Sequence, residues 1–366
     1  MRYSISKVTW FCMLAAFMAF TACDTGNTES GGDAITISSA ADLDYVRNDL
    51  TASYILTADI DLSGFSAGEG WVPIGDDTNG FTGTFNGNGH KIRNLSINRP
   101  GSDYQGLFGY IGSGGNVKNL TLTGGTVTGN ATIGALAGFV AGASSDDEGA
   151  RPGEGGGVEL PAAEVTGCSS SVTVSGMSEG FTLCGGLIGL NNGILTDCYA
   201  TADVTGGQYC GGLIGTNGGQ VSRCYATGDI MGTTASWTSC GGLIGQSWGT
   251  VTDCYATGSV TGNIYIGGLV GYASSGGSQI SNCYATGIAT GLSVPEETSI
   301  GGLIGCSDIT PSSSYYFQDS RNFIGTKVSE ADMKDAGSYT GWDFTGTWGI
   351  SSTINNGFPY LRSLVQ

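Results

Sequence analysis

The sequence predicts an all-β fold, a right-handed parallel β-helix with a short N-terminal capping helix and an aromatic C-terminal cap. Three observations predict it. A glycine-marked unit of about thirty residues recurs along the chain, which is typical of stacked repeats. Apolar and polar residues alternate within each unit with the period of two that strands require. The chain has 66 glycines but only seven prolines and is 40% hydrophobic, which favours a packed core over disorder.

The repeats are clearest in the middle of the chain, where residues 184–206 read CGGLIGLNNGILTDCYATADVTG and residues 210–232 and 240–262 follow the same pattern. Corresponding glycines are separated by 26, 30, 26 and 34 residues, at Gly185, Gly211, Gly241, Gly267 and Gly301. A unit this short cannot bury a hydrophobic face by itself, so copies must stack, about 4.8 Å apart. We expect such rungs over residues 106–320, interrupted by an inserted loop at residues 143–164.

Each repeat also predicts which side chains point inward. In residues 251–262 one face of the strand pattern is small and apolar, consisting of Cys254, Ala256, Gly258 and Val260. The opposite face carries Asp253, Tyr255, Thr257, Ser259 and Thr261. Because burying an aspartate and a tyrosine in every rung would be costly, we expect the first face to form the interior.

The N-terminus predicts an exported lipoprotein. Arg2 and Lys7 precede an apolar run over residues 8–20, and small residues then lead to Cys23. This pattern is typical of a signal peptide, here residues 1–22, and resembles the lipobox of bacterial lipoproteins, in which the cysteine is acylated. The alternative is an ordinary cleaved signal in which Cys23 is incidental. Residues 23–34 are predicted to be a flexible tether. The expected location is the cell envelope, at the outer membrane or cell surface.

Both ends of the repeat region carry candidate caps. Residues 35–105 are expected to hold the N-terminal cap and the first coils. There Ser39 and Asp42 form a helix start, and three apolar residues follow on one helical face, Leu43, Val46 and Leu50. Residues 321–366 are expected to close the other end with an aromatic cluster of Trp342, Phe344, Trp348, Ile350, Phe358, Tyr360 and Leu361. Uncovered ends would expose strand edges and invite polymerisation.

Cysteines recur at two repeat positions. One position holds Cys168, Cys198, Cys224, Cys254 and Cys283; the other holds Cys184, Cys210 and Cys240, and Cys306 stands alone. We interpret them as two buried ladders of free thiols, because cysteine behaves as a small hydrophobe. Disulfides between some of them are the alternative, since export permits oxidation. No metal site is predicted, because no C-x-x-C pair occurs and the chain has one histidine, His90.

The unit GGLIG with a downstream CYATG resembles the GLUG motif family, short repeats of bacterial surface proteins. These include adhesin-like proteins and the non-catalytic parts of some IgA-cleaving metallopeptidases. The resemblance extends to ITISSAADLDYVRNDL (35–50) and FTGTFNGNGHKIRNLSIN (81–98) at the start, and to GWDFTGTWGI (341–350) near the end. It implies a surface-exposed β-helix, and it implies no single activity.

The composition argues against several functions. A net charge of −18 repels phosphate backbones, so nucleic-acid binding is not expected. Most carboxylates occur singly, and the adjacent ones, at residues 76–77 and 146–148, lie in glycine- and serine-rich loops where solvated charge is the simpler interpretation. His90 lies in the turn GNGHKI and is expected to be structural. We therefore predict no catalytic residues and no cofactor.

Two rows of aromatic residues are candidate binding surfaces. The first is an edge of the repeats, where rings occur between successive units, at Phe181, Tyr209, Trp237 and Tyr265. The second is an outward ladder of Tyr199, Tyr225, Tyr255 and Tyr284. Each row also has a structural interpretation, in which the rings fold over their own turns or stack on one another.

The predicted function is that of a lipid-anchored surface protein acting as an adhesin-like binding or scaffold module. Its expected partners are the membrane, through the lipid, and a glycan or a protein of a host or neighbouring cell. The alternatives are a glycan-active lyase or hydrolase of the β-helix type and a purely structural envelope component.

Overall fold

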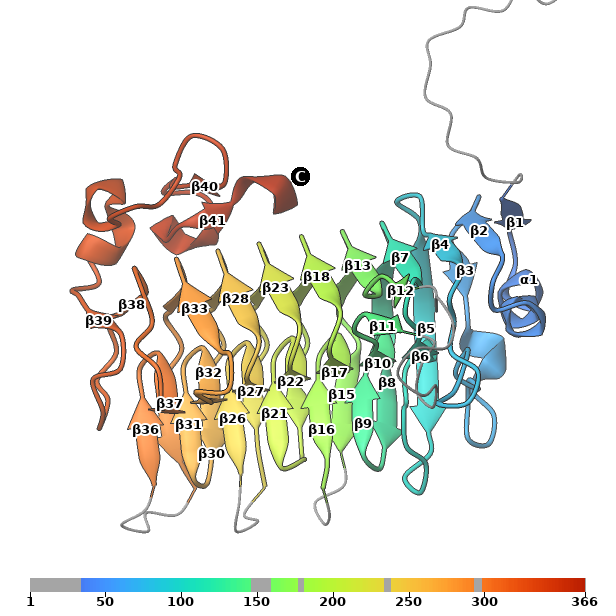
Figure 1. The fold of residues 1–366 in the computed structure, drawn as a ribbon, viewed down its shortest axis with the longest axis horizontal. Coiled ribbons are helices and arrows are strands. Elements are labelled where there is room, and N and C mark those ends of the chain that lie inside the picture. Colours follow the sequence, from blue (N-terminus) through green and yellow to red (C-terminus); the bar gives the residue numbers. More distant parts are fainter. Residues whose placement is uncertain (1–33, 146–158, 177–180, 234–237, 293–297, 366) are drawn as a thin grey trace, which may run out of the picture. The chain divides into compact units, whose positions relative to one another are not determined.

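The structure, a computed structural model, describes residues 34–145, 159–176, 181–233, 238–292 and 298–365. These residues belong to one compact unit, Asp33–Gln366, in which short strands stack in parallel as the rungs of a β-solenoid (Figure 1). The parallel β-helix is thus confirmed. The predicted signal peptide, Cys23 and most of the tether lie outside the described residues. Among the described residues, no helix is long and apolar enough to cross a bilayer.

Two large sheets form two sides of the solenoid. The nine-stranded sheet contains, in order, β1 (Ile35–Ile37), β2 (Ser53–Leu56), β4 (Thr84–Asn86), β7 (Asn116–Lys118), β13 (Glu164–Thr166), β18 (Ile194–Thr196), β23 (Gln220–Ser222), β28 (Thr250–Thr252) and β33 (Gln279–Ser281). The fifteen-stranded sheet is built on β3 (Ile60–Asp61), β5 (Lys91–Asn98) and β8 (Thr121–Gly129). From β8 one path runs through β14 (Ser169–Ser170), β19 (Tyr199–Ala200), β24 (Tyr225–Ala226), β29 (Tyr255–Ala256), β34 (Tyr284–Ala285), β38 (Tyr315–Tyr316) and β39 (Thr326–Lys327). The other runs through β15 (Thr173–Gly176), β20 (Val204–Thr205), β25 (Ile230–Met231), β30 (Val260–Gly262) and β35 (Ala289–Gly291).

Two further sheets complete each rung. The six-stranded sheet contains β9 (Thr132–Gly134), β16 (Leu183–Gly185), β21 (Tyr209–Gly211), β26 (Ser239–Gly241), β31 (Tyr265–Gly267) and β36 (Ser299–Gly301). The seven-stranded sheet contains β6 (Phe108–Ile111), β10 (Ala137–Val140), β17 (Ile188–Asn191), β22 (Ile214–Asn217), β27 (Ile244–Ser247), β32 (Val270–Ala273) and β37 (Ile304–Ser307). Small antiparallel pairs join β11 (Ser144–Ser145) to β12 (Glu159–Leu160) and β40 (Trp348–Gly349) to β41 (Tyr360–Leu361). The first of these pairs ties together the two ends of the predicted inserted loop, whose residues 146–158 lie outside the described part.

The glycines of GGLIG are required by close approaches between backbones. A Cβ on Gly241 would meet the carbonyl oxygen of Ile244, and one on Gly242 would meet the carbonyl oxygen of Gly268 in the next rung. A Cβ on Gly245 would lie 2.7 Å from the amide nitrogen of Cys210, in the preceding rung of the six-stranded sheet. The six- and seven-stranded sheets therefore meet at a tight corner that admits no side chain at these positions.

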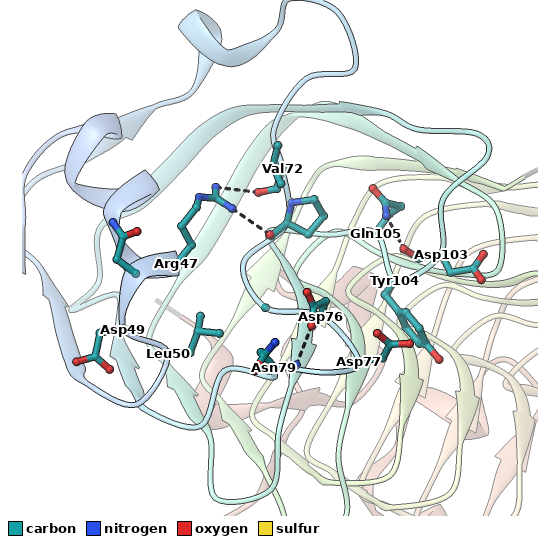
Figure 2. Close-up of a pocket in the computed structure, with 13 residues that line it drawn as sticks. Arg47, Asp49, Leu50, Val72, Asp76, Asp77, Asn79, Asp103, Tyr104 and Gln105 are labelled. Carbon is teal, nitrogen blue, oxygen red and sulfur yellow. Dashed lines mark hydrogen bonds between the residues drawn. The ribbon is translucent and has the colours of Figure 1, made fainter.

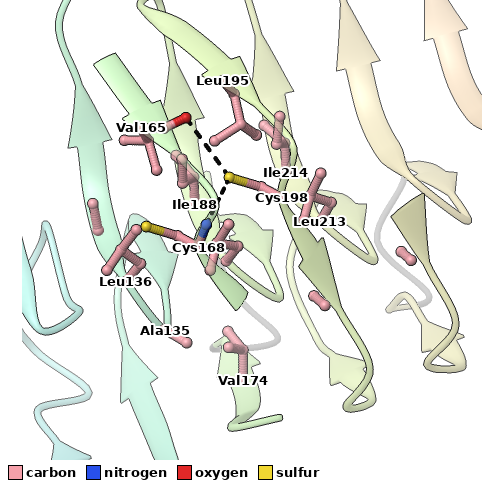
Figure 3. Packing of buried hydrophobic residues seen from close by; sticks show 14 of the residues in the cluster. Ala135, Leu136, Val165, Cys168, Val174, Ile188, Leu195, Cys198, Leu213 and Ile214 are labelled. Atoms are coloured by element: carbon pink, nitrogen blue, oxygen red, sulfur yellow. Dashed lines mark hydrogen bonds between the residues drawn. The ribbon is translucent and has the colours of Figure 1, made fainter. Parts of the chain in front are cut away.

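The interior is a continuous hydrophobic stack in which like residues lie above like residues (Figure 3). Cys254, Ala256 and Val260 are fully buried, as predicted from the strand pattern. The cysteine ladders are confirmed as well, since all nine described cysteines are free. The amide nitrogen of Cys168 donates to the sulfur of Cys198 at 3.3 Å, and this contact repeats from rung to rung. Burial raises the pKa of the Cys198 thiol well above its ordinary value.

A buried polar ladder was not anticipated from the sequence. Asn191 donates to the Asn217 side chain at 2.9 Å, and Asn217 donates to the hydroxyl of Ser247 at 3.3 Å. All three residues are fully buried. Each residue is the last of its strand in the seven-stranded sheet, and the two amide groups donate along the solenoid to the next rung, although Oδ1 of Asn191 accepts no hydrogen bond from the described residues.

The N-terminal cap forms as predicted. Helix α1 (Ala40–Tyr45) is capped by Ser39, whose hydroxyl accepts from the amide of Asp42, and it continues into a 3-10 turn, η1 (Val46–Asn48). Leu43 and Val46 are fully buried, and Leu50 packs against the core. The other 3-10 turns are η2 (Ser63–Phe65), η3 (Asp332–Lys334), η4 (Ala336–Ser338), η5 (Asn355–Gly357) and η6 (Arg362–Leu364).

The aromatic C-terminal segment forms a cluster, but not where the sequence led us to expect it. The last rung is instead followed by residues 320–328, where Asn322 donates to the carbonyl oxygen of Ile304 at 3.1 Å. The aromatic residues beyond pack sideways onto the fifteen-stranded sheet, and the Trp348 indole donates to the carboxylate of Asp253 at 3.2 Å. The physical reason is that this flank offers stacked tyrosine rings, on which Trp342 and Trp348 pack.

Candidate functional site

The tight corner between the six- and seven-stranded sheets carries a row of side chains outside the hydrophobic core, two from each rung, of which Thr132, Leu183, Thr216 and Ser239 are buried. We call this the corner row. Its successive pairs, from the N-terminal end, are Tyr104 with Tyr110, Thr132 with Phe139, Leu183 with Leu190, Tyr209 with Thr216, Ser239 with Gln246, Tyr265 with Tyr272, and Ser299 with Cys306. The strand registers fix these pairs, so the row runs along the solenoid at the spacing of the rungs.

Towards the C-terminal end the corner row is hollowed. A cavity of about 240 Å³ is lined by Tyr209, Thr238, Ser239, Gln246, Tyr265 and Tyr272. The rings of Tyr265 and Tyr272 stack at 5.4 Å between centroids, and Tyr209 stands two rungs away. The rung between them carries Ser239, whose hydroxyl is turned inward and donates to the carbonyl oxygen of Gly245 at 2.7 Å. A small residue between two tyrosines therefore creates the hollow.

Towards the N-terminal end three rings lie together. The rings of Tyr110 and Phe139 stack at 4.4 Å, and Tyr104 meets both edge-on at 6.0 and 6.3 Å. Each of these side chains is half-buried. Burial raises the pKa of Tyr110, with smaller contributions from Tyr104 and the charge of Asp77, so its hydroxyl stays neutral at ordinary pH.

Tyr104 also lines a pocket of about 850 Å³ (Figure 2). Four carboxylates line this pocket, those of Asp49, Asp76, Asp77 and Asp103. Its one cationic residue is Arg47, which pairs with Asp44 at 2.7 Å and donates to the carbonyl oxygens of Val72 and Pro73. The Asp76 carboxylate accepts from the amides of Thr78 and Asn79 and so holds its own turn. The pocket is acidic.

The predicted aromatic edge lies partly on the corner row. Tyr209 and Tyr265 belong to the row, while Phe181 is 64% exposed and meets the Tyr209 ring edge-on at 5.5 Å. Trp237 lies outside the described residues. Four further side chains of the row come from the facing sheet and were not predicted: Tyr110, Phe139, Gln246 and Tyr272. The sequence spacing could have identified them, because in each unit the residue on the seven-stranded sheet follows its partner on the six-stranded sheet by six or seven positions.

The predicted tyrosine ladder exists, and its rings stack in register. Centroid distances are 4.8 Å between Tyr199 and Tyr225, 4.8 Å between Tyr225 and Tyr255, and 5.0 Å between Tyr255 and Tyr284. The rings point away from the interior, as expected. However, Tyr255 is 5% exposed and Tyr284 is fully buried, because the C-terminal segment covers them. As a candidate ligand surface the ladder is thus reduced to Tyr199 and Tyr225.

A metal site is not apparent in the described part of the chain. No group of three histidine, cysteine or acidic side chains there could hold a metal ion. The ring of His90 contacts the carboxylate of Asp59 at 3.3 Å, which also binds Arg93 and the amide of Lys91. The hydrogen bond from Arg93 contributes most to lowering the Asp59 pKa to about 2. This arrangement ties two neighbouring rungs together at the surface.

Comparison with known proteins agrees with the repeat analysis. The GLUG motif matches residues 183–205, 206–231, 238–261 and 262–290. The chain is 49% identical over 109 residues to a protein of Evansella cellulosilytica provisionally described as a Gly-rich membrane protein; the match covers 28% of this chain and 13% of that protein. It is 38% identical over 200 residues to halomucin of Haloquadratum walsbyi, covering 51% of this chain and 2% of halomucin. The chain thus spans only a small part of the length of either relative.

A solved structure shares the fold across nearly the whole chain. It is that of a Bacteroides ovatus protein provisionally described as an immunoglobulin A1 protease, with a TM-score of 0.55 and 20% identity, and the match covers 91% of this chain and 94% of that one. At this identity the likeness concerns the fold alone. The protein is a glycine-rich repeat solenoid that carries four consecutive GLUG motifs over residues 183–290.

Proposed function

We propose that the protein is a lipid-anchored module of the cell envelope that binds an extracellular ligand along the corner row. The observation that carries the proposal is the row itself, in which half-exposed rings and polar side chains are held on rigid strands of a solenoid. Sites on rigid strands need little ordering when they bind, so such a surface suits recognition. The glycine-rich membrane protein and halomucin support an envelope location.

We further propose that the module is not an enzyme. Glycan hydrolysis needs a pair of carboxylic groups, one of them kept protonated by a raised pKa. In the acidic pocket the pKa of Asp49 is lowered instead, chiefly by hydrogen bonds from Thr51. Asp76 is occupied by its own turn. The alternative of a glycan-active enzyme keeps one supporting feature, the four carboxylates around that pocket.

Anchoring is tested separately from binding. The chain with its own leader is expressed in a Gram-negative host with labelled palmitate. Wild type should take up the label and sediment with membranes, whereas Cys23→Ala should remain unlabelled and soluble. Equal labelling of both chains would refute the lipid anchor without touching the binding proposal.

Binding is tested with cells that display the full chain on an array of glycans and surface proteins. The double variant Tyr265→Ala, Tyr272→Ala should lose the captured spots, because these rings border the hollow. Tyr45→Ala is the control, since it removes an exposed ring that lies on helix α1, outside both candidate binding surfaces. A double variant that captures the same spots as wild type, at equal display, would contradict the proposal.

A further inference from the structure

The corner row runs lengthwise over seven rungs, about 29 Å at the usual strand spacing. Aromatic side chains stand at its first, second, fourth and sixth rungs. The rungs between them carry Leu183 with Leu190, and Ser239 with Gln246; of these, Leu183 and Ser239 are buried, and Leu190 and Gln246 are partly exposed. A ligand that uses the whole row must therefore be long, narrow and itself repetitive, with alternating apolar faces and hydroxyl or amide groups.

The chemistry of the row limits the class of that ligand. No lysine or arginine stands among its seven pairs, and four aspartates line the pocket at its N-terminal end. The whole chain carries a net charge of −18. A polyanion such as a uronic-acid polysaccharide would be repelled over its entire length, because like charges along a surface raise the free energy of association. The ligand is therefore uncharged or basic.

An extended peptide fits the row less well. Peptides that bind lengthwise to β-proteins usually add a strand to a free sheet edge. Here the row lies on strand faces whose amides and carbonyls pair with the rungs before and after them, as between Tyr209, Ser239 and Tyr265. The solenoid thus offers side chains along the row and no free backbone, which favours a ligand recognised through ring faces and hydroxyl groups.

We propose, building on the proposed function, that the corner row binds a single strand of an uncharged polysaccharide along the solenoid axis. The apolar faces of its pyranose rings lie on the aromatic side chains at the two ends of the row. Its hydroxyl groups reach Gln246 and the acidic pocket beside Tyr104. An extended pyranose residue is close to one rung in length, so successive sugars meet successive rungs.

The proposal is tested on the full chain carrying Cys23→Ala, secreted and purified. Uncharged cello-, manno- and xylo-oligosaccharides, from disaccharide to octasaccharide, are titrated by calorimetry, with oligogalacturonates as the anionic comparison. Affinity for at least one uncharged series should rise with chain length up to about the hexasaccharide, and oligogalacturonates should not bind. Removing a ring at either end, by Tyr110→Ala or Tyr265→Ala, should weaken the longest oligosaccharide about tenfold, close to the contribution of one aromatic contact.

The two ends should also be distinguishable by length. Tyr110→Ala should leave short oligosaccharides that occupy the hollow unaffected, whereas Tyr265→Ala should weaken both short and long ones. Affinity that is independent of length, or tighter binding of oligogalacturonates, would overturn the proposal. If array capture depends on Tyr265 and Tyr272 but the captured ligand is a protein, the proposed function stands and the polysaccharide inference fails. If the double variant also captures as wild type does, both fail.

Discussion

Two sets of tyrosines that point away from the solenoid interior differ in how far they are buried. The flank ladder, Tyr199 to Tyr284, is stacked ring on ring, and its C-terminal half is buried beneath the chain's own last residues. The corner row intersperses partly exposed rings with smaller side chains, several of which are buried. The difference lies in spacing. The flank ladder has a ring in every rung and forms a continuous apolar strip that the chain itself covers, whereas the corner row lacks rings at its third and fifth rungs, and a hollow forms beside Ser239 on the fifth.

The contacts of the flank ladder are specific as well as apolar. The Tyr284 hydroxyl donates to the carbonyl oxygen of Pro359 at 2.6 Å, and Asn355 donates to that hydroxyl at 2.6 Å. Ser363 reaches the carboxylate of Asp197, three rungs further back, at 2.7 Å. These bonds fix the C-terminal segment over the ladder. Loss of its contacts should therefore lower the free energy of unfolding, whereas removal of rings from the corner row should weaken ligand binding.

The largest effect is expected from Trp348→Ala. Trp348 is fully buried between Tyr255, Tyr284 and Trp342, so its loss should lower the free energy of unfolding of the C-terminal part by about 3–5 kcal/mol. Hydrogen exchange measured by mass spectrometry should show faster exchange in residues 339–365 and β34. Tyr272→Ala, in the corner row, is the comparison variant. Equal losses of unfolding free energy in the two variants would contradict the difference between the flank ladder and the corner row.

Alkaline pH should act on the flank ladder next. Burial raises the pKa of Tyr225, Tyr255 and Tyr284 above the ordinary value of 10. The neutral phenol is thus favoured by folding, so this stabilisation is complete below pH 10 and is lost as the pH rises through the folded pKa values. Phenolate absorbance should rise together with loss of the circular dichroism of the sheets. Ionisation of every tyrosine near pH 10 without unfolding would contradict the burial of the ladder.

A smaller effect is expected from Asp197. Burial opposes its ionisation, but hydrogen bonds from Arg223 and Ser363 outweigh it and lower the Asp197 pKa below the ordinary value of 3.8. The carboxylate therefore stabilises the fold above that value, and the contribution disappears as the pH falls through the folded pKa. Asp197→Asn should cost about 1 kcal/mol at neutral pH, seen in urea unfolding, and nothing once the acid is protonated. Asp103→Asn, beside the corner row, should change stability less at either pH.

The smallest effect on stability should come from Tyr265→Ala. Its ring is half-buried and stacks on Tyr272 on the outside of the solenoid, away from the hydrophobic core. The free energy of unfolding should change by about 0.5 kcal/mol, as for an ordinary surface substitution. Thermal unfolding followed by circular dichroism measures this change, and a loss of several kcal/mol would make the ring structural.

Much of the fold could be predicted from the sequence because the same local pattern recurs in successive repeats. The interior position of Cys254, the stacking of the cysteines and the capping by Ser39 follow from period and residue type alone. The pairing of Tyr265 with Tyr272 depends on how sharply GGLIG turns the corner, which the backbone contacts of Gly245 determine. The place of Trp348 depends on a competition between two apolar surfaces far apart in sequence, and no local pattern decides it.

The contrast between the two surfaces can be measured directly by hydroxyl-radical footprinting of the full chain. Modification of each tyrosine is followed by mass spectrometry after brief exposure. The structure predicts clear modification of Tyr104, Tyr110, Tyr265 and Tyr272 and protection of Tyr255 and Tyr284. Rates for Tyr255 and Tyr284 that match those of the corner row would show that the C-terminal segment does not cover the ladder and would contradict the account.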